Sequence, residues 1–277
     1  MLRRAQKLQE SLIRQGMGKI ALSGIWFVAS PLFIFLIPTT WRLQAVDYGI
    51  PIATTLVIRA LFQQYRTASA VRWNIWFSLL VGTGCFLIGF AVVPIGYKLG
   101  WSCFTYGVLQ DSSALFKKIF LQEIPLIFGV TWLGYEWTLR GIALSRLRAK
   151  WGLWPALMMS ALAGLSLQWA RLPNSNGTGD CVYLCATAGE LLIVEIICGL
   201  LFVASGRLAP SAIFHGLMRI TEMFLLGDIL SPYLPLRNLI SSNPRFYAAR
   251  VGVLILLVVL LTMVIHASRR RELKNTV

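Results

Sequence analysis

Acidic residues are scarce in this sequence. Only 11 Asp and Glu accompany 26 Lys and Arg over 277 residues, and charged residues of both signs make up 13% of the chain, against about 25% in ordinary soluble domains. No polar stretch between the apolar runs is long enough to build a separate soluble domain. The shortage of charge therefore excludes an ordinary soluble enzyme and indicates that lipid is the solvent.

Several motifs with a defined chemistry are also missing. The sequence contains no P-loop, no dinucleotide-binding glycine pattern, no internal repeat and no low-complexity segment, and we predict no cofactor. Its five cysteines show no pair spacing typical of zinc sites, and it has only two histidines. No small-residue cleavage site follows the first apolar run, so the N-terminus does not resemble a removed signal peptide.

Apolar residues are abundant instead, at 57% of the chain with a mean hydropathy of +0.68. A membrane-crossing helix needs about 20 of them in a row. The runs that qualify are 20–38, 48–64, 74–95, 119–140, 153–170, 182–204, 208–228 and 248–267. We therefore predict an all-α fold, a polytopic transmembrane helix bundle of about eight spans. It forms one domain over residues 20–267, between basic segments at 1–19 and 268–277.

A net charge of +15 is typical of proteins that bind nucleic acid, but the positions of the basic residues in the sequence indicate another role. Most of them lie at the ends of apolar runs, where they determine topology. With the N-terminus cytoplasmic, the inside flanks carry about twice as many Lys and Arg as the outside flanks, as the positive-inside rule requires. We predict a multi-pass protein with both termini in the cytoplasm, or in the stroma if the membrane belongs to a plastid. The lipid bilayer surrounds it, and we expect it to bind no nucleic acid.

Ionisable residues cluster inside the later runs. Each costs on the order of 2.5–3.5 kcal/mol to insert, so such residues usually face the bundle interior and have partners. They are Glu136 and Arg140 in the fourth run, Glu190 and Glu195 in the sixth, and His215, Arg219 and Glu222 in the seventh. Glu136 and Arg140 are four apart, as are His215 and Arg219, so each pair shares a helical face.

The basic turn near Lys150 and Trp151 brings Gln168 into the same region. Glu136 precedes that turn by roughly 22 Å of helix and Gln168 follows it by roughly 25 Å, so the two side chains lie at a similar depth. We expect Glu136, Arg140, Gln168 and His215 to converge on one buried cavity. The alternative is that each residue only satisfies its neighbours within the membrane.

Three sequence blocks resemble the CPBP family of intramembrane metalloproteases, the CAAX protease and bacteriocin-processing or Abi family. Tyr135-Glu136-Trp137-Thr138-Leu139-Arg140-Gly141 is similar to its Glu-Glu-x-x-x-Arg-Gly motif. The run from Pro155 to Trp169 is similar to the span with Phe-x-x-x-His, and the run from Ser205 to His215 is similar to Gly-Ser-Leu-x-x-Pro leading into His-x-x-x-Asn. The resemblance covers residues 119–228 and implies a four-helix core with catalytic positions at Glu136, Arg140 and His215.

The sequence departs from that pattern at the positions that carry the chemistry. Tyr135 stands for the Glu that activates water, Gly164 and Gln168 stand for Phe and His, and Arg219 stands for Asn. A phenol keeps its proton at neutral pH, and an amide does not shuttle one. Catalytic zinc normally takes three protein ligands, which two histidines cannot provide, so we predict no metal.

These substitutions favour a proteolytically inactive member of the family, a scaffold or assembly factor that binds another integral membrane protein. Two alternatives stay open. The first is an active CAAX-type glutamate endopeptidase in which Glu136 becomes the base. The second is a small transporter subunit with a polar pathway along Glu190, Glu195 and Arg219, although the sequence shows neither the half-helix breaks nor the inverted repeat typical of transporters.

Overall fold

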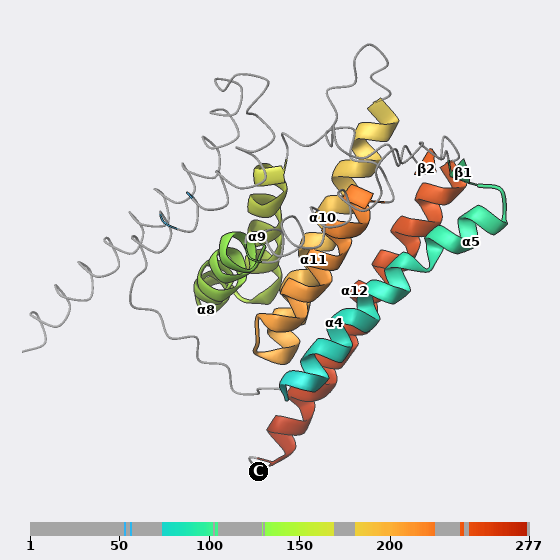
Figure 1. The fold of residues 1–277 in the computed structure, drawn as a ribbon. Helices are drawn as coiled ribbons and strands as arrows, with labels where there is room; N and C mark the ends of the chain where they lie inside the picture. Colours follow the sequence, from blue (N-terminus) through green and yellow to red (C-terminus); the bar gives the residue numbers. More distant parts are fainter. Residues whose placement is uncertain are drawn as a thin grey trace, which may run out of the picture.

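Helices make up nearly all of the part of the chain that the structure describes (Figure 1). The structure is a computed structural model, and it describes residues 53, 56, 74–101, 103–104, 129, 131–168, 181–224, 239–240 and 244–275. The segment 1–19, the predicted span 20–38 and all but two residues of the span 48–64 lie outside these ranges. Within them, the predicted all-α character is confirmed apart from one strand pair of two residues on each side.

The first described span consists of two helices in line. Helix α4 (Ile75–Phe90) begins at Asn74, whose side chain accepts a hydrogen bond from the backbone of Trp76 at 3.0 Å. Helix α5 (Val92–Lys98) follows after Ala91. Pro94 explains the break, because it has no N–H to donate to the carbonyl four residues earlier and is tolerated only in the first turn of a helix.

The next described helix, η3 (Thr131–Leu144), is a π-helix and continues into α8 (Ser145–Trp151). The sequence predicted ordinary α-helical geometry here, and the structure corrects it. Over so few turns the apolar pattern fits an α-helix and a π-helix equally well, because their backbone hydrogen bonds span four and five residues respectively. Gly152, with φ of 82°, ends α8, and α9 (Leu153–Gln168) begins directly after it.

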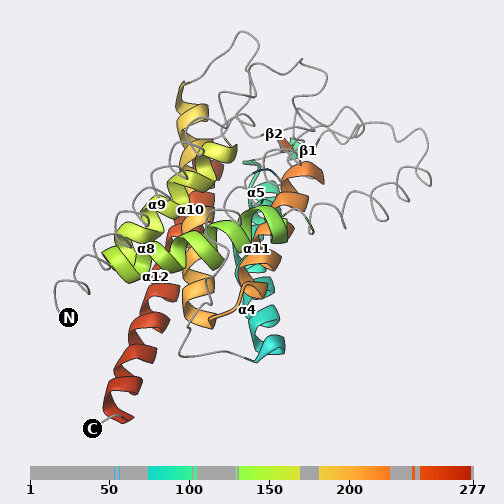
Figure 2. The same ribbon diagram turned by 90° about the vertical axis from the view of Figure 1, so that its left-hand side faces the viewer.

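Two further helices complete the region that the sequence assigned to the core. Helix α10 (Cys181–Ser205) and helix α11 (Ala209–Phe224) are separated by a short turn in which Gly206 has φ of 63°. Pro210 lies in the first turn of α11, where its missing N–H breaks no helical hydrogen bond. Figure 2 shows α8 and the helix that precedes it running across the direction of α10 and α11, and η3 contacts both of these helices.

The last helix, α12 (Pro244–Asn275), packs against α10. Just before it, β2 (Leu239–Ile240) pairs antiparallel with β1 (Cys103–Phe104), and Cys103 faces Ile240. The main core lies between α9, α10, α11 and α12 and includes the buried side chains of Leu157, Leu201, Phe214 and Leu254.

Among the residues that the structure describes, three helical segments are long and apolar enough to cross a membrane: Ile75–Lys98, Thr187–Ser205 and Arg245–Ser268. Large apolar side chains on their outer faces are exposed, with Trp76 at 75%, Leu80 at 70% and Met263 at 61%. Such surfaces fit lipid as the surrounding solvent. The predicted membrane character is therefore supported, and the count of about eight spans stays a prediction.

Candidate functional site

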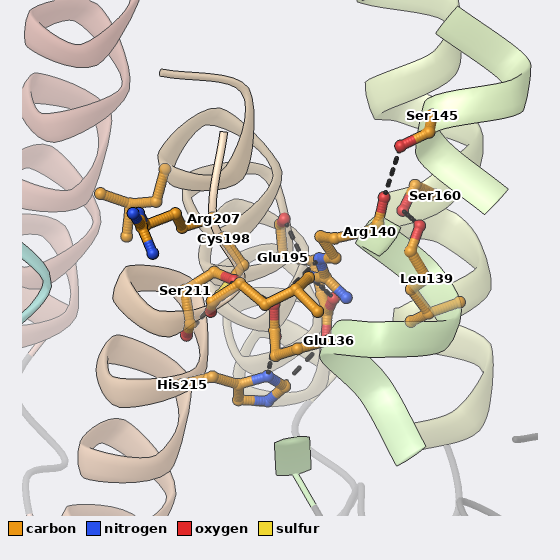
Figure 3. A network of polar contacts seen from close by, with 12 residues as sticks. Glu136, Leu139, Arg140, Ser145, Ser160, Glu195, Cys198, Arg207, Ser211 and His215 are labelled. Carbon is orange, nitrogen blue, oxygen red and sulfur yellow. Dashed lines mark hydrogen bonds and ion pairs between the residues drawn. The ribbon is translucent and has the colours of Figure 1, made fainter. Parts of the chain in front are cut away.

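Glu136 lies fully buried on η3, with its carboxylate directed toward α11 (Figure 3). Its Oε1 lies 3.0 Å from Nδ1 of His215, and the Ser211 hydroxyl donates a hydrogen bond to its Oε2. Nε of Arg140 lies 3.7 Å from the same Oε2. Ser211 belongs to the first turn of α11, where the partial positive charge of a helix N-terminus favours an anion. The carboxylate is thus held from three sides.

Glu195 on α10 is the second carboxylate of the cluster and connects the other side chains. Its Oε2 pairs with Nη2 of Arg140, which also donates to the Glu195 backbone carbonyl at 3.1 Å. Its Oε1 accepts a hydrogen bond from Nε2 of Gln168 at 2.5 Å. The Nε2 atom of His215 lies 4.0 Å from Oε1. Arg140 therefore bridges Glu136 and Glu195, and Gln168 fixes the second of them.

Gly164 makes room for this arrangement. A Cβ atom at this position would collide with the carboxylate of Glu195. Position 164 is one of those at which the sequence departs from the CPBP pattern, since it has glycine where the family has Phe. The two departures on α9 thus act on the same carboxylate, because Gly164 leaves space for it and Gln168 donates a hydrogen bond to it.

Two serines fix η3 around the cluster. The hydroxyl of Ser160 on α9 donates to the carbonyl of Leu139 at 3.2 Å, and the hydroxyl of Ser145 donates to the carbonyl of Arg140 at 3.2 Å. In both cases a serine hydroxyl donates a hydrogen bond to a backbone carbonyl of the π-helix. They tie the backbone beside Arg140 to the helices on either side.

The four side chains predicted to converge do lie together, although as a cluster of direct contacts. Glu136, Arg140, Gln168 and His215 are all buried and belong to one connected cluster. Of the two other predicted positions, Tyr135 lies on η3 beside Glu136, and its side chain is outside the described part. Arg219 lies on α11 four residues after His215 and is buried.

Glu190 belongs to a different contact. Its carboxylate pairs with Nη2 of Arg250 on α12 at 2.5 Å. Glu190 and Glu195 are five positions apart, which places them on different faces of an α-helix. One face of α10 therefore binds α12 through an ion pair, and the other holds the cluster.

Sequence reasoning missed two members of the site and the central position of a third. Ser211 was not singled out, although it lies four residues before His215 and so shares its face of α11. Cys198 was not singled out either, although it lies three residues after Glu195 on the same face of α10. Glu195 was recognised as an intramembrane ion, but the sequence could not show that it joins Arg140 to Gln168.

Three side chains of the cluster carry atoms that bind metals. Single ligand atoms of Glu136, Cys198 and His215 all lie within 4.8 Å of one another, and all three residues are buried. The sequence-based prediction of no metal considered only the two histidines as zinc ligands. With an oxygen, a sulfur and a nitrogen donor in place, the residues present fit a metal ion with three protein ligands.

Comparisons with known proteins identify no relative. No family model matches the sequence, and no match was found among curated proteins or among solved structures. The likeness to the CPBP family thus depends on the motif residues of η3, α9 and α11. The function of the chain is inferred from the contacts that those residues make.

Proposed function

We propose that this chain is a CPBP-like multi-pass membrane protein of about eight spans with both termini cytoplasmic, and that it does not cleave peptide bonds. It works as a scaffold or assembly factor for another integral membrane protein. The observation that carries the proposal is that both carboxylates of the cluster are engaged by protein groups. Ser211 and His215 occupy the two oxygens of Glu136, and Gln168 and Arg140 occupy those of Glu195.

Hydrolysis of a peptide bond needs a group that accepts a proton from water and donors that stabilise the oxyanion. Tyr135 replaces the first Glu of the motif and is a poor base. Glu136 and Glu195 both form ion pairs with Arg140, so each carboxylate already has protein partners. These contacts join four helices, η3, α9, α10 and α11, at one buried point, which suits a scaffold better than a catalyst.

The apolar outer surfaces suit such a role as well. Helix α4 exposes Trp76, Phe77 and Leu80, and α12 exposes Leu256 and Met263. In the membrane these faces meet either lipid or the helices of a partner. The partner in this proposal is therefore an integral membrane protein that packs against helix surfaces.

The test is a cleavage assay in vesicles. Wild type and E136Q are reconstituted with a prenylated CAAX peptide and, separately, with a membrane-embedded peptide, and an active CAAX endopeptidase serves as the positive control. Because loss of a general base alone removes about 10²–10⁴-fold of rate, we expect no product from either form. Cleavage by the wild type that disappears in E136Q would contradict the proposal and make Glu136 the base.

One observation favours the active endopeptidase as a second candidate. Glu136 and His215, two positions that match the family motifs, keep a direct contact of 3.0 Å. The same assay distinguishes the two candidates.

A further inference from the structure

We propose that Cys198 supplies the third protein ligand of a buried transition-metal site, together with Glu136 and His215. The three ligand atoms lie within 4.8 Å of one another, and they come from three helices, α10, η3 and α11. The inference goes beyond the proposed function and needs no catalysis. In it, the metal joins three helices of the bundle at one point.

The donor set indicates zinc. A thiolate sulfur, an imidazole nitrogen and a carboxylate oxygen are the three ligand types that Zn²⁺ takes in proteins, in tetrahedral sites with bonds of about 2.0–2.3 Å. Cations such as Mg²⁺ and Ca²⁺ prefer oxygen alone. Such bonds bring ligand atoms to roughly 3.3–3.8 Å of one another. His215 Nδ1 and Glu136 Oε1 lie 3.0 Å apart, and all three ligand atoms lie within 4.8 Å of one another. Around an ion, the first pair would move slightly apart, and any pair near the 4.8 Å limit would move about 1 Å closer.

The imidazole of His215 also has the surroundings of a metal ligand. Metal-binding histidines usually direct their other ring nitrogen at a carboxylate or carbonyl, which fixes the ring. Here Nδ1 faces Glu136, while Nε2 lies 4.0 Å from Oε1 of Glu195. Gln168 and Arg140 hold Glu195 in turn. The carboxylate nearest the second ring nitrogen of His215 is thus itself held in position, although 4.0 Å is longer than a hydrogen bond.

Charge balance agrees with a divalent ion. Glu136, Glu195 and the thiolate of Cys198 would carry three negative charges, and Arg140 carries one positive charge among these four groups. A divalent cation brings this set to zero, which matters because unbalanced charge is costly in a buried site. On binding, the Cys198 thiol releases its proton to solvent and exchanges its weak contact with the Ser211 carbonyl, at 3.9 Å, for a bond to the metal.

The inference explains how this chain forms a three-ligand set despite Gln168. At position 168 it has an amide where the CPBP motif has His, and that amide is engaged with Glu195. Cys198 on the neighbouring helix α10 lies at the cluster instead and is buried without a disulfide. Cys198 on α10 thus supplies the third donor, and α9 supplies none.

The experiment measures metal binding without any activity. The full chain is purified in mild detergent, and metal content is determined after loading with Zn²⁺ and removal of the excess. The protein is then loaded with Co²⁺, because thiolate ligation gives an intense near-ultraviolet charge-transfer band. We expect one ion per chain and a thiolate band in the wild type. C198S should bind more weakly by more than the roughly 10–100-fold typical of a lost outer-shell group, and it should lack the band.

C85S is the matched control, because Cys85 on α4 is also a buried free cysteine and lies outside the cluster. C185S tests the exposed cysteine in the same way. Both should keep the metal and the band. Absence of a thiolate band in the wild type overturns the proposal even if C198S does not fold. Unchanged zinc content and an unchanged band in C198S overturn it as well.

Discussion

At the scale of single residues, the ion pair between Arg140 and Glu195 has the largest predicted effect on stability. In E195Q the guanidinium stays buried without its closest counter-charge, and losing one partner of a buried pair costs about 3–5 kcal/mol. We expect a marked drop in the thermal unfolding midpoint in detergent. C185S, at an exposed position, should leave the midpoint unchanged.

The double variant R140Q/E195Q checks whether the effect is electrostatic. Removal of both charges eliminates the uncompensated ion, so the double variant should be more stable than the sum of the two single losses predicts. Strict additivity would show that Arg140 and Glu195 act independently, against the contact in the structure.

A second residue-scale prediction concerns Gly164. In G164A the new methyl group meets the carboxylate of Glu195 and forces it away from Arg140 and Gln168. Overpacking of this kind costs typically about 1–3 kcal/mol. G189A on α10 is the control, because a Cβ there meets nothing within 4 Å, and Ala in a helix is more favourable than Gly by about 0.5–1 kcal/mol. Thermal unfolding of both variants should therefore shift in opposite directions, and equal shifts would contradict the packing at Gly164.

At the scale of elements, the packing of α4 against α11 depends on a close backbone approach. A Cβ on Gly82 would lie 2.6 Å from the carbonyl oxygen of Pro210 and 2.9 Å from its Cα. Backbone atoms at the start of a helix cannot rotate away as a side chain can, so G82A must push the two helices apart. G84A lies two residues further along α4, where a Cβ meets nothing within 4 Å.

We expect G82A to lower the unfolding midpoint and to increase cleavage by added protease, and G84A to do neither. If both variants behave like the wild type, the close contact between α4 and α11 is not present in the membrane.

At the scale of the whole molecule, the prediction concerns topology. In a cysteine-free background, a single cysteine at position 148 should be reached by an impermeant maleimide from the cytoplasmic side, and one at position 176 from the opposite side. The reason is that Arg146, Arg148 and Lys150 belong to the basic inside flank, and α9 lies between the two positions. Labelling of both from one face would refute the eight-span arrangement.

The sequence by itself determined where the later helices lie and which of their side chains gather. Predicted runs 74–95, 182–204 and 248–267 correspond to α4 with α5, α10 and α12, because an apolar run of span length has no other way to satisfy its backbone in lipid. The convergence of Glu136, Arg140, Gln168 and His215 was also predictable, since buried charges need partners.

Only the tertiary structure decided which groups face one another. The partner of Arg140 is Glu195, and Glu190 pairs instead with Arg250 on α12. Nothing local in the sequence distinguishes the two glutamates, because both lie on α10 and differ only in the face they occupy. The π-helical geometry of η3 and the close approach at Gly164 were equally invisible. Such contacts depend on how helices cross, and crossing is set by the fit of side chains far apart in the chain.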